Sequence, residues 1–165
     1  MPIINTVRGD LVERAKDGEY DVIVHGCNTH CTMGSGIAPV IANAFEGVRE
    51  ADEQFPVSRG STMRLGHYSY APAGNSFYPV VVNAYTQHYF REKPDGTPAA
   101  DYDAIRAVFE QLNVDIYETY SDDHLIGIPM LGAGLAGGDW ETIESIINEV
   151  TPNLNIELVI FEPSL

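Results

Sequence analysis

The chain has 165 residues, of which 44% are hydrophobic and 20% charged, and its formal net charge at pH 7 is −15. This length suits one hydrophobic core, so we expect a single domain over residues 1–165. Nine basic residues against 24 acidic ones cannot easily form the positive stripe that binds the groove of duplex nucleic acid. No apolar run approaches the roughly 20 residues that span a bilayer, and the first residues do not resemble a signal peptide. We therefore expect no membrane partner and a cytoplasmic location.

Taken in chain order, the apolar patterns predict strands and helices that mostly alternate. Strands are expected at residues 3–7, 20–27, 61–71, 76–86, 124–130 and 156–161, and helices at 11–16, 37–47, 101–120 and 139–150. The turn sequence PAGN joins the third and fourth strands into a hairpin, because Pro and Gly favour turn dihedral angles. The stretch 87–99 is expected to be a loop, and residues 50–63 carry no clear pattern.

This order of elements predicts an α/β fold. Residues 20–27 form a continuous apolar run, which is typical of a buried central strand in a parallel sheet. The longest helix, 101–120, places its apolar residues on one face and begins after Asp101, a suitable N-cap. We expect three layers, with a mixed, mostly parallel central sheet covered by helices on both faces.

Two glycine-rich loops carry the functional signal. MGSG (33–36) and LGAGLAGG (131–138) each follow a buried strand and precede a helix. Loops in this position lie at the carboxyl ends of strands, where α/β proteins bind ligands, and their backbone N–H groups can hold phosphate without a lysine. The pattern of Gly132, Gly134 and Gly137 matches G-x-G-x-x-G, a weak signal alone. Tight turns without a ligand remain an alternative for each loop.

Together with their neighbours, these loops resemble the macrodomain family of ADP-ribose-binding modules. RGD after the first strand, HGCN followed by MGSGIA after the second, and IPMLGAGLAGGDW near the end agree in order and spacing with that family. The resemblance is closest to the branch that contains ADP-ribose 1″-phosphate phosphatases and the terminal ADP-ribose glycohydrolase type, and it is weak over residues 46–60. It implies a macrodomain fold with ADP-ribose or ADP-ribose 1″-phosphate as ligand. ADP-ribosylated macromolecules are a further candidate.

The resemblance also implies the residues that bind the ligand. Asp10 would accept a hydrogen bond from the adenine amino group, with a simple turn residue as the alternative. Asn28 would contact the distal ribose, and Phe161 would lie near the adenine, unless it is an ordinary core residue. The full expected set is Asp10, Leu11, Asn28, Gly34, Ser35, Gly36, Ile37, Gly132, Ala133, Gly134, Leu135, Ala136 and Phe161.

The first loop also contains four residues that can ligate zinc. His25, Cys27, His30 and Cys31 lie close together, but structural zinc sites usually combine two separated ligand pairs, and no distant second pair is present. A Cys27 that packs as a small apolar residue fits better. We therefore expect no metal, no cofactor and no disulfide.

Catalysis is less clearly indicated than binding. The glycohydrolase type uses a lysine just after the fourth strand and an aspartate in the second loop, where this chain has Gln87 and Ala136. The phosphatase branch remains, and we expect hydrolysis of ADP-ribose 1″-phosphate to ADP-ribose and phosphate. The candidate proton-transfer residues are His25, His30, His88 and Asp139.

Each of these four residues also has a purely structural explanation, as a core histidine, a solvated loop residue or a helix N-cap. A non-catalytic ADP-ribose reader is the main alternative function. A hydrolase that removes ADP-ribose from modified protein or nucleic acid, and a different nucleotide binder such as an NAD enzyme, also remain open.

Overall fold

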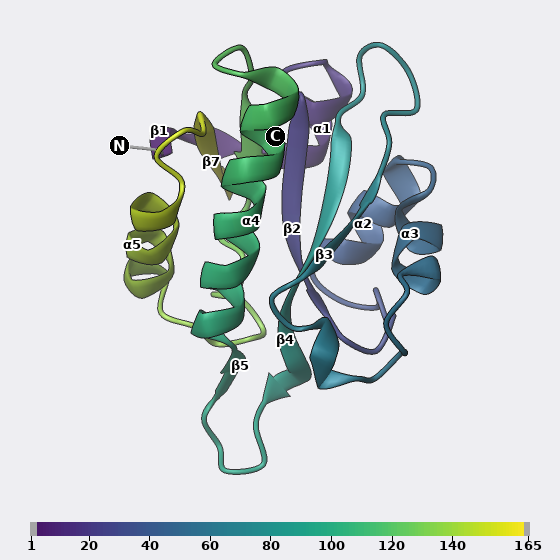
Figure 1. Ribbon diagram of the computed structural model, residues 1–165, viewed down its shortest axis with the longest axis vertical. Coiled ribbons are helices and arrows are strands. Elements are labelled where there is room, and N and C mark those ends of the chain that lie inside the picture. Colours follow the sequence, from purple (N-terminus) through teal and green to yellow (C-terminus); the bar gives the residue numbers. More distant parts are fainter. Residues whose placement is uncertain (1–2, 164–165) are drawn as a thin grey trace.

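The structure, a computed structural model, describes residues 3–163. Seven strands form one sheet in the order β1-β7-β6-β2-β4-β3, with β5 paired to the outer part of β4 (Figure 1). The strands are β1 (Ile3–Gly9), β2 (Val22–Asn28), β3 (Tyr68–Ala71), β4 (Val80–Glu92), β5 (Pro98–Ala100), β6 (Ile126–Ile128) and β7 (Ile156–Phe161). The helices are α1 (Leu11–Lys16), α2 (Ala38–Ala44), α3 (Val48–Gln54), α4 (Tyr102–Tyr120), α5 (Trp140–Val150) and the short 3-10 helix η1 (Thr62–Arg64).

The sheet is mixed and mostly parallel, as the sequence predicts. β1 pairs with β7, β7 with β6, β6 with β2 and β2 with β4, all in parallel. Only β3 and β5 run antiparallel to β4. β2 lies in the centre of the sheet, and its first four residues are fully buried, which explains its continuous apolar sequence.

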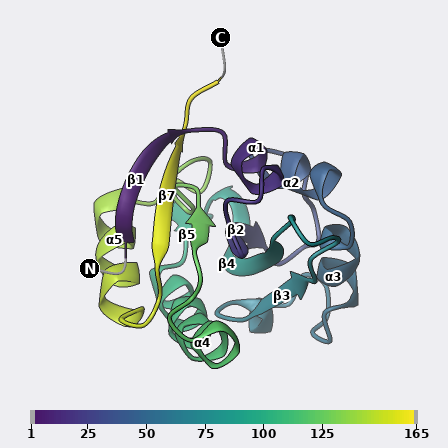
Figure 2. The same cartoon turned by 90° about the horizontal axis from the view of Figure 1, so that it is seen from above.

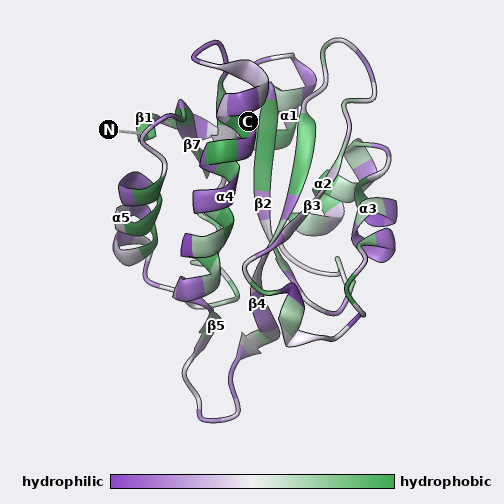
Figure 3. Cartoon of the chain, viewed as in Figure 1, coloured by the Kyte–Doolittle hydropathy of each residue, from purple (hydrophilic) through white to green (hydrophobic). Residues whose placement is uncertain are grey.

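Helices cover both faces of the sheet. α4 and α5 lie against one face, and α1, α2 and α3 lie against the other (Figure 2). Apolar residues gather on the sheet and on the inner faces of the helices, while the outer faces are hydrophilic (Figure 3). The predicted three-layer fold class is therefore confirmed. The predicted face of α4 is also confirmed, because Ile105, Val108, Phe109, Leu112 and Ile116 are all buried.

The predicted loop at 87–99 is wrong. β4 continues to Glu92 and pairs with β5 through Gln87–Ala100 and Glu92–Pro98. A turn closes this hairpin, with Gly96 at a φ of 83° and a hydrogen bond of 2.8 Å from Lys93 N to Thr97 O. The Asp-Gly pair at 95–96 is typical of hairpin turns and could have predicted this hairpin. The hairpin extends beyond the body of the molecule (Figure 1).

The region 46–80 also differs from the prediction. Residues 48–54 form α3, which was not predicted, and the predicted strand at 61–71 is a strand only from Tyr68. The reason is Arg64, which is the last residue of η1. Its side chain is buried in the protein, whereas a strand would be expected to point it outward. The predicted strand at 76–86 begins only at Val80, because the Asn75 side chain accepts hydrogen bonds from the N–H groups of Phe77 and Tyr78 and holds them in a turn.

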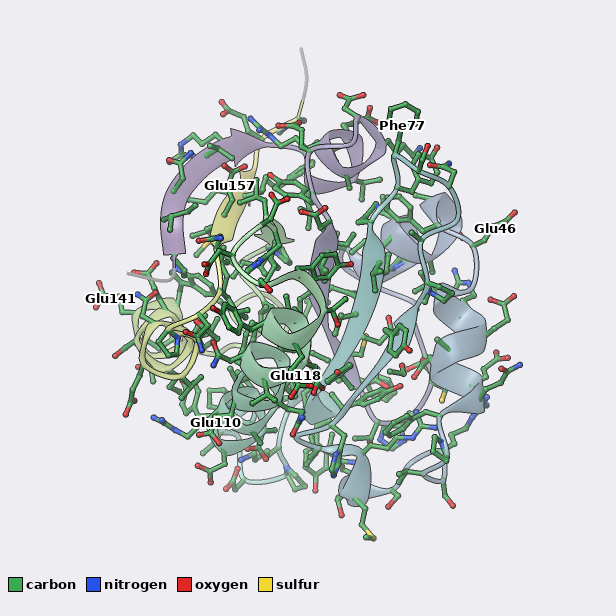
Figure 4. The ribbon with its side chains drawn as sticks, turned by 45° about the horizontal axis from the view of Figure 1, so that its top comes forward. Glu46, Phe77, Glu110, Glu118, Glu141 and Glu157 are labelled. Atoms are coloured by element: carbon green, nitrogen blue, oxygen red, sulfur yellow. The ribbon has the colours of Figure 1, made fainter. Side chains whose placement is uncertain are left out.

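The acidic residues are distributed over the surface. Glu46, Glu110, Glu118 and Glu141 are exposed and come from elements on both faces of the sheet (Figure 4). Within residues 3–163, no helix combines the length and apolar character that crossing a membrane requires.

Candidate functional site

A cavity of about 620 Å³ lies at the carboxyl ends of the central parallel strands. Its walls come from the β1–α1 junction, the end of β2 with the loop after it, the loop after β6, and the end of β7. The volume is within the range of small-molecule sites. Several large apolar side chains at its rim are exposed to solvent, namely Val40, Phe90, Met130, Leu135 and Phe161. Open apolar surface of this kind is typical of a ligand site.

The structure brings most of the predicted ligand-binding residues together around this cavity. The lining includes Asp10, Leu11, Asn28, Ser35, Gly36, Ile37, Gly132, Gly134, Leu135, Ala136 and Phe161. Gly34 and Ala133 lie in the same two loops but do not line the cavity. The two glycine-rich loops, which are about 100 positions apart in the sequence, therefore face one space.

Both loops present free backbone N–H groups to that space. Among the hydrogen bonds of the described residues, none is donated by the N–H of Ser35, Gly36 or Ile37 in the first loop. The same holds for Gly134, Leu135 and Ala136 in the second loop. The lining described here contains no lysine or arginine. An anion in the cavity would therefore meet main-chain donors and no basic side chain.

The glycines of the second loop have two distinct roles. Gly138 N–H donates to Gly132 O at 2.7 Å, and a Cβ at Gly138 would lie 2.5 Å from that same oxygen, so this position must be glycine for the loop to close. Gly132 adopts a φ of 78°, which favours glycine. At Gly134, by contrast, an added Cβ would meet nothing within 4 Å. No part of the protein occupies the space beside Gly134, so the missing side chain leaves that space open to a ligand.

Asp10 has a structural role and still lines the cavity. It is the N-cap of α1, and its Oδ1 accepts hydrogen bonds from the N–H groups of Val12 and Glu13 at 3.0 and 3.1 Å. Within the described residues, Oδ2 takes part in no hydrogen bond. Both interpretations of Asp10 from the sequence are thus compatible with its position.

Asn28 and Phe161 lie at different parts of the cavity. Asn28 Nδ2 donates to the backbone oxygen and the hydroxyl of Thr32, and Asn28 Oδ1 accepts from His30 N–H, so this side chain shapes the first loop. Phe161 is 67% exposed at the end of β7 and is therefore not an ordinary core residue. Its open ring can stack against a planar group.

None of the four candidate proton-transfer residues, His25, His30, His88 and Asp139, lines the cavity. His25 is fully buried, and its Nε2 lies 2.6 Å from Asn83 Oδ1. An amide oxygen only accepts, so Nε2 carries the proton. Burial lowers the pKa of His25. The alternative of a satisfied core histidine therefore fits this residue best.

Asp139 is the N-cap of α5. Its Oδ2 accepts hydrogen bonds from the hydroxyl and the N–H of Thr142 at 2.6 and 3.1 Å, and these bonds lower the pKa of Asp139. Its own N–H donates to the Tyr102 hydroxyl. The position supports the capping role that the sequence also allowed.

His88 is closer to the cavity than His25 or Asp139. Its Nδ1 lies 2.6 Å from Thr29 Oγ1, and its ring lies 4.7 Å from that of His30. His30 in turn stacks on Phe90, which does line the cavity. Partial burial and the neighbouring His30 lower the pKa of His88, so its imidazole is neutral at pH 7. A neutral imidazole can accept a proton.

The four possible zinc ligands are separated by their contacts. Cys27 Sγ lies 3.6 Å from His25 Nε2, whereas His30 packs on His88 and Cys31 Sγ donates to Asp52 O at 3.4 Å. No group of three His, Cys, Asp or Glu side chains within residues 3–163 is arranged to hold a metal ion.

Gln87, Phe90 and Asp52 are among the cavity residues that the predicted set does not include. Gln87 and Phe90 line the cavity because β4 extends past the end of β2, and the sequence prediction of a loop at 87–99 hid this. Asp52 reaches the cavity from α3. The position of Asp52 between the apolar residues Val48 and Phe55 is a weak signal that this carboxylate is buried.

Comparison with known proteins agrees with this geometry. Residues 24–147 match the model of the Macro domain family. The chain is 33% identical over 164 residues to an uncharacterised 17.5 kDa protein of Enterobacteria phage T4, from the tk-vs intergenic region, with 99% of each chain covered. It is 26% identical over 158 residues to the ADP-ribose 1″-phosphate phosphatase of Candida albicans, covering 89% of this chain and 93% of the phosphatase.

A solved structure shows the same fold. The structure of Thermosipho africanus DarTG in complex with ADP-ribose superposes with a TM-score of 0.70 at 15% identity, covering 100% of this chain and 43% of the other. The family match covers most of the sequence, so the protein belongs to the Macro domain family.

One buried atom next to the cavity residue Gly26 generates a stability prediction. Thr86 is fully buried, and its Oγ1 is without a hydrogen-bond partner among the described residues. A Cβ on Gly26, which lines the cavity, would lie 2.8 Å from this oxygen. We expect Thr86→Val to raise the free energy of unfolding by about 1 kcal/mol in urea denaturation, because it removes a buried hydroxyl that makes no bond.

Thr151 is the matched control for this change. It is also fully buried, but its hydroxyl donates to Ile147 O at 2.6 Å. Thr151→Val should therefore lower the free energy of unfolding by about 1 kcal/mol. If both substitutions destabilise the protein equally, the Thr86 hydroxyl has a partner after all.

Proposed function

We propose that this protein binds ADP-ribose in the cavity, with its pyrophosphate between the two glycine-rich loops. The observation that carries the proposal is the set of free N–H groups at residues 35–37 and 134–136 in one cavity whose described lining includes no basic side chain. Backbone donors of this kind bind phosphate oxygens directly. The DarTG structure, which contains ADP-ribose, and the named phosphatase from Candida albicans support the same ligand.

The adenosine would occupy the end of the cavity formed by Asp10, Leu11 and Phe161. The free Oδ2 of Asp10 would accept a hydrogen bond from the adenine amino group, and the exposed ring of Phe161 would stack on the base. The terminal ribose would then lie toward Asn28, at the end of β2. This orientation follows the order of the strands in the sheet, in which β1 and β7 lie on one side of β6 and β2 lies on the other.

Hydrolysis of ADP-ribose 1″-phosphate is the second candidate function. It is favoured by the relative of that name and by the neutral imidazole of His88 beside the Asn28 end of the cavity. In this mechanism, His88 would accept a proton from the water that attacks phosphorus and return it to the sugar oxygen as the P–O bond breaks, which releases phosphate and ADP-ribose.

Gly134→Val tests the binding site. The larger side chain would fill the space where no protein atom lies within 4 Å, so we expect at least a 100-fold loss of affinity for ADP-ribose in isothermal titration calorimetry, about 2.7 kcal/mol. Gly74→Val is the control, since Gly74 is exposed, is equally open and lies far along the chain in the β3–β4 turn. Normal binding by the Gly134 variant would place the ligand elsewhere.

Asp10→Asn tests the orientation of the ligand. Asparagine keeps an oxygen that can cap α1 but replaces the second acceptor by an NH₂ group, which faces the adenine amino group as donor against donor. We expect weaker binding of ADP-ribose by about tenfold and unchanged binding of ribose 5-phosphate, measured by calorimetry. Equal effects on both ligands would contradict an adenine contact.

Phosphate release tests catalysis. With ADP-ribose 1″-phosphate as substrate, we expect phosphate to appear, and we expect His88→Gln to slow its release about 100-fold or more. His67→Gln, an exposed histidine before β3, is the control. Because the pKa of His88 is lowered, the rate should hold as the pH falls from 8 to about 6.5 and decline only below that. Binding of ADP-ribose without any phosphate release would instead identify a reader.

A further inference from the structure

Asp52 is a buried carboxylate that reaches the cavity from α3. It is only 2% exposed, yet it is part of the cavity lining. Its Oδ1 accepts hydrogen bonds from Tyr85 Oη at 2.8 Å and from Arg64 Nη1 at 3.2 Å. A buried carboxylate is costly unless it is paired, so this position needs an explanation beyond packing.

Arg64 pairs with this carboxylate and is itself fixed in place. It is 1% exposed, its Nε donates to Val57 O at 2.9 Å, and its guanidinium lies over the rings of Phe55 and Tyr85 at 5.4 and 5.2 Å. An arginine remains charged at any ordinary pH. The pair therefore keeps a negative carboxylate in a defined orientation at the cavity wall.

A chain of hydrogen bonds with a fixed direction also ends at Asp52. His25 donates to Asn83 Oδ1, and Asn83 Nδ2 donates to Ser69 Oγ at 3.1 Å. The hydroxyls of Ser69 and Tyr85 lie 2.9 Å apart. The Tyr85 hydroxyl has one proton and donates it to Asp52, so the Ser69 hydroxyl must donate to the Tyr85 oxygen. The chain therefore ends in the Tyr85 hydroxyl, which donates to Oδ1 of Asp52.

The second oxygen of the carboxylate faces the cavity. Among the hydrogen bonds between described residues, none is accepted by Oδ2. If it were also shielded from solvent, it would be a buried polar atom without a partner, but among the described residues only Thr86 Oγ1 is such an atom. Oδ2 is therefore accessible, and because Asp52 lines the cavity, we infer that Oδ2 is open to the cavity. The thiol of Cys31 lies beside this carboxylate and is only a weak donor, so Oδ2 can still accept from a stronger donor such as a ligand hydroxyl.

The neighbouring groups at this end of the cavity also lack free donors. The Nδ2 of Asn28 donates within its own loop, to Thr32, and the Nε2 of Gln87 donates to the carbonyls of Tyr89 and Phe90. Burial raises the pKa of the Cys27 thiol well above its ordinary value, so this thiol stays protonated, and it is a weak donor directed towards Asn83 Oδ1 at 4.0 Å. An end rich in acceptors is suited to a ligand that brings its own donors, such as the hydroxyls of a sugar.

We propose that Asp52 is a specificity-determining residue, whose Oδ2 accepts a hydrogen bond from a hydroxyl group of the terminal ribose. This inference rests on the proposed binding of ADP-ribose. Through this contact, a residue of α3 would distinguish ADP-ribose from nucleotides that end at the diphosphate, such as ADP. Cys31, at a φ of 58°, connects the first loop to Asp52 O and thereby fixes the loop and the carboxylate relative to each other.

Calorimetry with ADP-ribose and with ADP tests the proposal, since ADP lacks the terminal ribose. The wild-type protein should bind ADP-ribose at least about tenfold more tightly than ADP, as expected for a hydrogen bond to a charged group. Asp52→Asn should remove that preference and leave the affinity for ADP within about twofold. Glu53→Gln, which makes the same change at an exposed neighbour, should leave both affinities unchanged.

Asp52→Asn leaves Arg64 buried without its partner and can unfold the protein for that reason. The double variant Asp52→Asn with Arg64→Met removes both charges and is the second test, with the same expected loss of preference. Equal wild-type affinities for ADP-ribose and ADP, or a preference that survives in a folded Asp52 variant, would overturn the role of Asp52 while nucleotide binding stands. If the wild type binds neither ligand, the proposed function fails and this inference with it.

Discussion

The parallel pairing of β2 with β6 and β4 is the constraint on which the site depends. Val22 pairs with Ile126 on one side and with Val80 on the other, so the three strands start at the same edge of the sheet and run in the same direction. The chain therefore leaves β2 and β6 at the opposite, shared edge. Two glycine-rich loops distant in sequence meet there because the strands before them are neighbours.

This arrangement resolves the conflict between an acidic protein and an anionic ligand. A net charge of −15 repels phosphate at long range, and several arginines form ion pairs away from the loops. Arg14 pairs with Glu19 and Arg106 with Glu149, whereas Arg64 is buried and pairs with Asp52 at the cavity wall. Main-chain N–H groups contribute partial positive charge without a basic residue. They also cannot be neutralised by the surrounding carboxylates in the way that a flexible lysine can.

The sequence predicted the parts of this structure that depend on local pattern. The buried run of β2, the apolar face of α4 and the two glycine loops each have a periodicity or composition that one local conformation satisfies. The layers and most of the cavity lining follow from these elements. The placement of His25 did not follow, because its distance from the cavity depends on the direction in which one β2 side chain points.

The region from α3 to β3 could not be predicted for a different reason. Its conformation depends on long-range contacts of polar residues, above all the bond between Arg64 and Asp52, which are separated by 12 positions. A charged side chain in a sequence normally indicates a surface position. Only the folded chain shows that these two charges are buried against each other and that Tyr85, from the central part of the sheet, completes their hydrogen bonding.

The two proposals also constrain each other. Two unit charges 4 Å apart repel by about 4 kcal/mol at an effective dielectric constant of 20. If Asp52 holds a hydroxyl of the terminal ribose, a phosphate on the same ribose must therefore point away from the carboxylate. Asp52 contacts the first loop through Cys31, whereas His88 contacts it through Thr29 and His30 from β4. The two residues thus contact the first loop through different residues, so a ribose held by α3 leaves the β4 side of that loop free for the phosphate.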